Sequence, residues 1–214
     1  AITLAVLLVS CRQDDLPDSM PTAHEGYVAL RFSADIPAMQ EVVTRSVDPD
    51  GGGVQDMTLF CFDSYGLFTT TVEAKVTPTG NGAGLTGNFE AEVPENTRTV
   101  HFLANQNMSE FKEDKFRNKS EAEVMALLEG SSGRMIYWAR FTCDPDNDSK
   151  IDAQMADKGN TIKMIRNHAQ VSIDNPINGW IEVTGFVAYN TNAFGTVAPY
   201  HPEKGFDFEW PGED

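Results

Sequence analysis

Apolar and polar side chains alternate along residues 28–36. Five apolar side chains fall on every second position there: Val28, Leu30, Phe32, Ala34 and Ile36. Because successive side chains of a β-strand point to opposite faces, this pattern predicts a strand whose apolar face needs a partner sheet. Arg45 follows in a segment without a strong structural pattern. Two interpretations stay open: an ordinary edge strand followed by a loop, or a removable strand that carries its own cleavage site.

Short runs of β-branched and aromatic residues, separated by Gly and Pro, predict further strands along the chain. Residues 57–62 are apolar on both faces apart from one threonine, which predicts a central strand covered on both sides. A turn at 63–66 and a return strand over 67–76 complete a hairpin. Alternation predicts more strands over residues 85–93, 98–105, 135–141 and 180–189.

Two segments depart from simple alternation. In residues 161–173 the apolar positions change from even to odd numbers, which predicts a β-bulge near residues 165–167. Residues 120–129 predict a short helix in a crossover connection between strands, since Ser120 and Glu123 form a capping box. Its expected apolar face and its expected stop are Val124, Leu127, Leu128 and Gly130.

Composition adds a strong acidic balance. The 214 residues include 32 Asp and Glu against 16 Lys and Arg, a formal charge of −16, which argues against binding to nucleic acid or anionic membranes. The length suffices for one sizeable core, or for one domain and the start of another. The three cysteines show no metal-binding spacing, and the sequence leaves open whether Cys61 and Cys143 form a disulfide.

The first residues have the composition of an export signal. Residues 1–10 are apolar but far short of the about 20 residues that span a bilayer, so they predict the h-region of a signal peptide that lacks its charged start here. Residues 8–11 resemble the lipobox of bacterial lipoproteins, in which the cysteine, here Cys11, is lipidated. The alternative is a plain signal peptide with a chance cysteine. Residues 11–25 predict a flexible tether, and its acidic start resembles the surface-export signal of Bacteroidetes lipoproteins.

Taken together, several segments resemble the fimbrillin family, the subunits of Bacteroidetes type V pili and related surface adhesins. Their order and spacing carry the resemblance, which covers residues 11–189. Residues 165–171 look like a characteristic strand of that family, with Gln170 in place of the usual lysine. The other carriers are the lipobox and residues 28–36, 44–46, 54–66 and 89–105.

The resemblance implies an all-β fold, a transthyretin-like Greek-key β-sandwich of about seven strands. With the sequence patterns it predicts a truncated signal peptide, a lipid-anchored tether, an N-terminal sandwich domain, and a linker or the start of a second domain, in residues 1–10, 11–25, 26–194 and 195–214. Residues 26–45 would be the removable first strand. No cofactor is implied.

The resemblance also implies a mechanism. The protein would reach the outer membrane through a lipid on Cys11, and an arginine-specific protease would cut between Arg45 and Ser46. The first strand would then vacate a groove filled by Val28, Leu30, Phe32, Ala34 and Ile36, and a donor strand from another subunit would replace it. The implied function is a structural pilus subunit that mediates adhesion at the cell surface. The alternative within the family is an anchor or accessory lipoprotein that stays uncut.

A different alternative is a calcium- or glycan-binding surface domain. Four carboxylates occupy positions 1, 3, 5 and 9 of a segment that resembles an EF-hand loop: Asp144, Asp146, Asp148 and Asp152. Ser149 and Met155 replace the glycine and the bidentate glutamate that such loops depend on, which favours a solvated acidic loop. Tyr200 and Trp210 are aromatic side chains suited either to glycans or to packing against another domain.

An enzyme is the least supported class. The four histidines are isolated in sequence, and neither HExxH nor GxSxG occurs. The glycine-rich residues 78–84 lack the lysine and hydroxyl of a phosphate-binding loop. We therefore expect a protein that is not an enzyme. The four histidines are His24, His101, His168 and His201.

Overall fold

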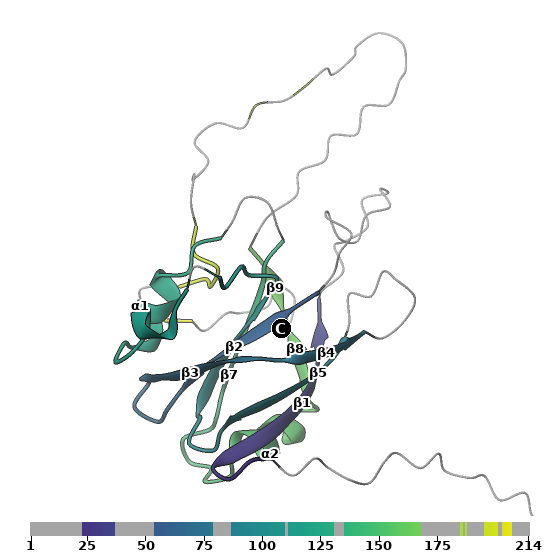
Figure 1. Cartoon of the computed structure of the whole chain (residues 1–214), viewed down its shortest axis with the longest axis vertical. Helices are drawn as coiled ribbons and strands as arrows, with labels where there is room; N and C mark the ends of the chain where they lie inside the picture. Colours follow the sequence, from purple (N-terminus) through teal and green to yellow (C-terminus); the bar gives the residue numbers. More distant parts are fainter. Residues whose placement is uncertain are drawn as a thin grey trace, which may run out of the picture.

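Two β-sheets pack face to face in this protein (Figure 1). The computed structural model describes residues 23–36, 54–78, 87–109, 111–130, 135–167, 185, 187, 195–200 and 203–206. These residues form nine strands, two short α-helices and one 3₁₀ turn. The all-β sandwich expected from the sequence is confirmed. The described residues hold nine strands where the resemblance implies about seven, and two predicted strands are each divided.

The smaller sheet has four strands in the order β4 (Lys75–Pro78), β5 (Gly87–Pro94), β1 (Tyr27–Asp35) and β8 (Thr161–Lys163). The first strand therefore lies inside the sheet. It runs antiparallel to β5 and parallel to β8. Its residues alternate between buried and more exposed, as the sequence pattern predicts.

The larger sheet is antiparallel and has five strands in the order β3 (Phe68–Glu73), β2 (Met57–Phe62), β6 (Thr99–Ala104), β7 (Tyr137–Thr142) and β9 (Ile165–Arg166). Every residue of β2 is buried, which confirms the predicted central strand. Every residue of β6 is buried as well, although alternation predicts burial at only every second position. The reason is that both faces of this sheet are covered.

Two hydrophobic clusters cover these faces. The larger one fills the space between the sheets and includes the inward row of β1. The second lies on the other face of β2, β6 and β7. Helix α1 (Glu121–Ala126) contributes Val124 and Met125 to it, and Phe116 follows the 3₁₀ turn η1 (Glu113–Lys115). Val197, Ala198 and Phe206 complete the cluster. Figure 1 shows α1 on the side of the sandwich away from β1. Thus a long excursion between β6 and β7 forms a third layer.

The predicted capping box is present at the start of α1. The Ser120 hydroxyl accepts a hydrogen bond from the Glu123 amide, and the Glu123 carboxylate accepts one from the Ser120 amide at 2.8 Å. The helix ends earlier than predicted, at Ala126 rather than at Glu129. Leu127, expected on the apolar face, is 44% exposed, whereas Met125 is buried. The connection is also not a crossover, because β6 and β7 are antiparallel neighbours.

Two of the predicted strands each divide between the two sheets. The return strand expected over residues 67–76 divides at Ala74, so that β3 and β4 belong to different sheets. The segment after residue 161 shows no bulge at 165–167; it divides at Met164 into β8 and β9, also in different sheets. Backbone hydrogen bonds fix both passages: Ala74 N donates to Met57 O, and Met164 N donates to Asp35 O.

Other expectations fall partly or wholly outside the described residues. The strand expected over residues 180–189 lies outside the described residues, apart from residues 185 and 187. Cys61 and Cys143 are described; both are buried and both are free thiols. Within the described part of the chain, no helix has the length and apolar character needed to span a membrane.

Candidate functional site: the seat of the first strand

The inward row of β1 forms a large part of the core between the sheets. The exposed fractions of its side chains are 6, 1, 3, 1 and 4% for Val28, Leu30, Phe32, Ala34 and Ile36. Phe32 stacks on Phe89 of β5 with ring centroids 5.4 Å apart and meets Phe102 of β6 edge-on at 5.0 Å. Since fully burying a large apolar side chain contributes about 1.5–3 kcal/mol, this row is a major source of stability.

The two strands that pair with β1 differ in length. Pairing with β5 is continuous, from Tyr27 opposite Pro94 to Ser33 opposite Asn88. Pairing with β8 is short and involves only Ser33, Ala34 and Asp35 of β1. Ser33 is bound on this side, since its amide donates to Asn160 O at 2.8 Å and its hydroxyl lies 3.1 Å from that of Thr161.

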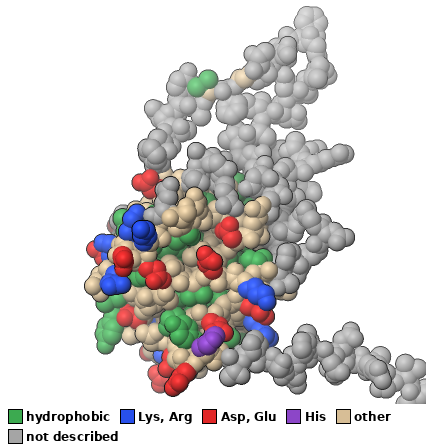
Figure 2. Space-filling model, in the orientation of Figure 1, with side chains coloured by type: hydrophobic (Ala, Val, Ile, Leu, Met, Phe, Trp, Pro, Cys, Tyr) green, Lys and Arg blue, Asp and Glu red, His purple; other side chains and the backbone are tan. Residues whose placement is uncertain are grey.

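Charged side chains face outward along the β1–β5 boundary. Arg31 Nε lies 3.4 Å from Glu90 Oε1, and Lys75 of β4 is the register partner of the same Glu90 on its other side. Just before β1, His24 Nδ1 is hydrogen-bonded to Glu92 Oε2; this bond raises the pKa of His24 and lowers that of Glu92. Figure 2 shows acidic and basic side chains next to each other on the face in view.

The residues proposed for lipidation and cleavage are Cys11, Arg45 and Ser46, and all three lie outside the described residues. Ile36 is the last described residue before Arg45. The role of the cleavage residues therefore stays a prediction, whereas the burial of the strand that precedes them is an observation. His168, His201 and Trp210 also lie outside the described residues.

The four aspartates of the acidic segment are not gathered around one point. Gln154, which is 4% exposed, holds this loop: its Oε1 accepts from Asp144 N at 2.8 Å, and its Nε2 donates to the carbonyl oxygens of Asn147 and Ser149. Helix α2 (Ile151–Asp157) begins inside the segment and buries Ile151 and Met155 in the core. Among the described residues, no three His, Cys, Asp or Glu side chains are grouped as a metal site. Asp144, Asp146 and Asp148 are exposed, as the solvated acidic loop requires. Gln154 orders this loop, and α2 follows it.

A buried polar network that the sequence did not reveal lies under α1. Trp138 Nε1 donates to His101 Nδ1 at 2.9 Å, and His101 Nε2 lies 2.6 Å from Glu121 Oε1. Because an indole nitrogen can only donate, Nδ1 of His101 is the acceptor and Nε2 carries the proton given to Glu121. Arg140 completes the network through Nε and Nη2, both bound to the Glu121 carboxylate.

Burial shifts the protonation of this network. Desolvation lowers the pKa of the fully buried His101, only partly opposed by Glu121, so the imidazole is neutral. Burial by itself would raise the pKa of Glu121. Hydrogen bonds from His101 and Arg140 outweigh this effect and lower the pKa to about 2. With both ring nitrogens engaged, His101 braces β6, β7 and α1 together rather than serving as a free base.

Tyr200 is 55% exposed, as a surface aromatic residue would be, but its ring is not isolated. It packs edge-on against Phe206 at 5.2 Å, and Phe206 in turn packs against His101 at 5.0 Å. Tyr200 and Phe206 are thereby joined to the network under α1. These contacts lie within the chain, so binding of a glycan and packing against another domain both stay predictions.

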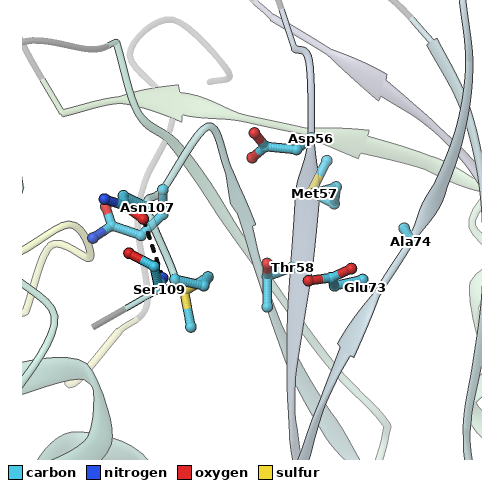
Figure 3. Close-up of a pocket in the computed structure, with 9 residues that line it drawn as sticks. Asp56, Met57, Thr58, Glu73, Ala74, Asn107 and Ser109 are labelled. Carbon is cyan, nitrogen blue, oxygen red and sulfur yellow. Dashed lines mark hydrogen bonds between the residues drawn. The ribbon is translucent and has the colours of Figure 1, made fainter. Parts of the chain in front are cut away.

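A hollow of about 470 Å³ lies at one end of β2 and β3. Figure 3 shows Glu73 and Thr58 on these two strands, with Asn107 and Ser109 on the loop after β6, where Asn107 Oδ1 accepts from Ser109 N at 3.1 Å. The other labelled carboxylate is Asp56. None of the described residues that line the hollow is Lys or Arg. Its charge therefore disfavours anionic ligands.

No family model matches the chain, and no curated protein does. Among solved structures, the chain is similar to a fimbrial assembly protein from Parabacteroides distasonis ATCC 8503, with 12% identity and a TM-score of 0.34. The match covers 65% of this chain and 54% of that protein, so the chain spans about half of its length. A likeness of this degree carries no functional argument.

Proposed function

We propose that this protein is a non-catalytic structural subunit of a cell-surface pilus, and that β1 is a placeholder strand removed before assembly. The supporting observation is the position of β1. It lies between β5 and β8 inside a sheet, and together with Ile36 it places five side chains in the core, yet it comes first among the described strands. A strand in this place can be separated from the remaining strands by a single cut between β1 and β2.

The physical consequence of that cut gives assembly its direction. Loss of β1 would expose apolar walls that include Phe89 and Phe102, together with the unpaired backbone edges of β5 and β8. Exposed edges and alternating pockets of this kind accept a strand from another chain, through backbone hydrogen bonds and inserted side chains. Because each large side chain contributes about 1.5–3 kcal/mol, an empty groove is unstable enough to favour refilling.

The remaining parts of the proposal come from sequence resemblance. Cys11 would carry the lipid that brings the precursor to the outer membrane, and Arg45 would be the residue after which an arginine-specific protease cuts. Other pilus subunits would supply the strand that replaces β1, and the polymer would serve in adhesion. An anchor or accessory lipoprotein that retains β1 is the competing role within the same family.

The test is limited digestion of the purified full chain with an arginine-specific protease. We expect one early cut after Arg45, followed by polymers visible by size-exclusion chromatography and electron microscopy. Arg45→Ala should abolish both events. Arg117→Ala is the matched control, because Arg117 is an exposed arginine in an ion pair with Asp114, and it should behave like the wild type.

Two results would refute the proposal. One is resistance of the Arg45 bond under conditions that digest an unfolded control, which would favour the uncut anchor. The other is normal polymerisation of Arg45→Ala, which would mean that assembly does not require this cut.

A further inference from the structure

We infer that the groove left by β1 selects its incoming strand by chemistry: the strand runs antiparallel to β5, with an aromatic side chain in the place of Phe32, a small one in the place of Ala34 and a basic one opposite Glu90. The inference rests on the proposed replacement of β1. It goes beyond that proposal by stating which polypeptide the groove accepts.

The inner row sets a shape requirement. Phe32 lies opposite Phe89 in the β1–β5 register and also touches Phe102 of the facing sheet, so two rings shape the seat of one side chain. A small residue in that seat would leave a cavity, which is costly because the surroundings relax only partly. Two positions later there is space only for a small side chain. Ala34 is 1% exposed and lies opposite Ile162 of β8. A large side chain in its place would overpack the core.

The outer row sets a charge requirement. Residues 23–36 bring two basic side chains to β5, since Arg31 pairs with Glu90 and His24 pairs with Glu92. Removal of this segment takes both away and leaves two carboxylates along the rim of the groove, with Lys75 as the basic register partner of Glu90. A rim of this sign attracts a basic side chain opposite Glu90 and repels an acidic one.

Together, β5 and β8 also set the direction of the strand. Asp35 is the register partner of Lys163 on β8, four residues after Arg31. A strand with the same charges inserted in reverse about Phe32 would place its acidic residue in the position of Ala29, opposite Glu92. Like charges directly opposite one another destabilise a strand pair, so the forward direction is preferred.

The experiment is peptide exchange into the full chain after a cut between β1 and β2. The cut is made at Arg45 or, where that bond resists, at a sequence-specific protease site inserted after it. Fluorescent peptides spanning residues 24–36 compete with the resident β1 fragment, and fluorescence anisotropy gives their dissociation constants. Three peptides are compared: the natural sequence, a Phe32→Ala variant and an Arg31→Glu variant. Three proteins are compared: the natural chain, Glu90→Arg and the milder Glu90→Gln. Circular dichroism checks that each protein variant is folded.

We expect Phe32→Ala to weaken binding about a hundredfold or more, because a lost buried aromatic leaves a cavity. Arg31→Glu should weaken binding to the natural protein about threefold to tenfold, as expected for one cross-strand charge reversal. The Glu90→Arg protein should reverse the preference between these two outer-row peptides, and Glu90→Gln should abolish it. Such a reversal would mean that residue 90 recognises the charge of the peptide residue opposite it. A general loss of stability would not produce this result.

Peptides that exchange equally well whatever their sequence would overturn the inference while leaving a replaceable β1 intact. A charge preference unchanged in Glu90→Arg and Glu90→Gln would likewise overturn the role of Glu90. Failure of every peptide to exchange would overturn both the inference and the proposed strand replacement. The same assay therefore separates the two ideas.

Discussion

Glu121→Gln tests the buried network that joins α1 to the five-stranded sheet. The glutamine has the same size and can still accept a hydrogen bond from His101, but it removes the negative charge that faces Arg140. The pKa of Glu121 is lowered from 4.5 to about 2, and its side chain is 18% exposed, so solvent screens it little. At 1.36 kcal/mol per pKa unit, the charged carboxylate contributes on the order of 3 kcal/mol to stability.

The sign of the pH dependence follows from the direction of this shift. A carboxylate with a lowered pKa stabilises the fold above its unfolded pKa, near 4.5, and its contribution disappears as the pH falls towards about 2. The free energy of unfolding of Glu121→Gln should therefore lie about 2–3 kcal/mol below that of the wild type at pH 7. The gap should narrow as the pH falls below about 4.5.

Urea unfolding followed by tryptophan fluorescence measures this gap, at pH 7 and in steps down to the lowest pH at which the wild type stays folded. Glu95→Gln is the matched control, because Glu95 pairs with Lys150 and both side chains are about half exposed. An exposed pair contributes at most about 1 kcal/mol, so the control should remain close to the wild type. The reasoning fails if Glu121→Gln unfolds like the control at pH 7, or if the gap is the same at every pH.

Three further predictions concern β1 and the cysteines. Phe32→Ala should lower the free energy of unfolding of the uncut protein by about 3–5 kcal/mol, whereas Tyr27→Ala on the 45% exposed outer face should change it by about 0.5 kcal/mol or less; equal effects in urea unfolding would contradict the buried seat. The pKa of His24, raised by its hydrogen bond to Glu92, means that this contact is complete below about pH 6.5 and is lost as the pH rises through the raised value. Proton NMR should show a lower His24 midpoint in Glu92→Gln, and an unchanged midpoint would refute the contact. Burial raises the pKa of Cys61 to about 12, so iodoacetamide should label it only after unfolding, as peptide mass mapping can show. Labelling of Cys61 in the native protein would contradict its burial, and a peptide linking Cys61 to Cys143 would contradict the two free thiols.

The candidate site was predictable where it depends on local periodicity. Alternation along one short segment was enough to identify the four buried side chains of β1 and Ile36 just after it, because a strand places every second side chain on the same face. The same reasoning identified Phe89, Ala91 and Val93 on β5, which are also buried. It could not identify Glu90 as the partner of Arg31, since the pair is 59 positions apart in the sequence and depends on register.

Prediction failed where a distant contact changed the role of a residue. The acidic segment had an EF-hand-like spacing of aspartates, but the side chain that organises it is Gln154, an amide that composition did not single out. His101 seemed isolated because its partners, Trp138 and Glu121, come from another strand and a helix. Burial of all of β6 required a third layer, which alternation within one strand cannot report.

By itself, the sequence determined the β-rich class, the capping box of α1 and the inward row of β1. Each depends on residues within a few positions of one another, where backbone geometry decides the outcome. Only the tertiary structure decided that β1 lies between an antiparallel and a parallel neighbour, and that the chain changes sheets at Ala74 and Met164. Such pairings are selected by the burial of whole faces against each other, because burial is a property of the assembled sheets and not of any single segment.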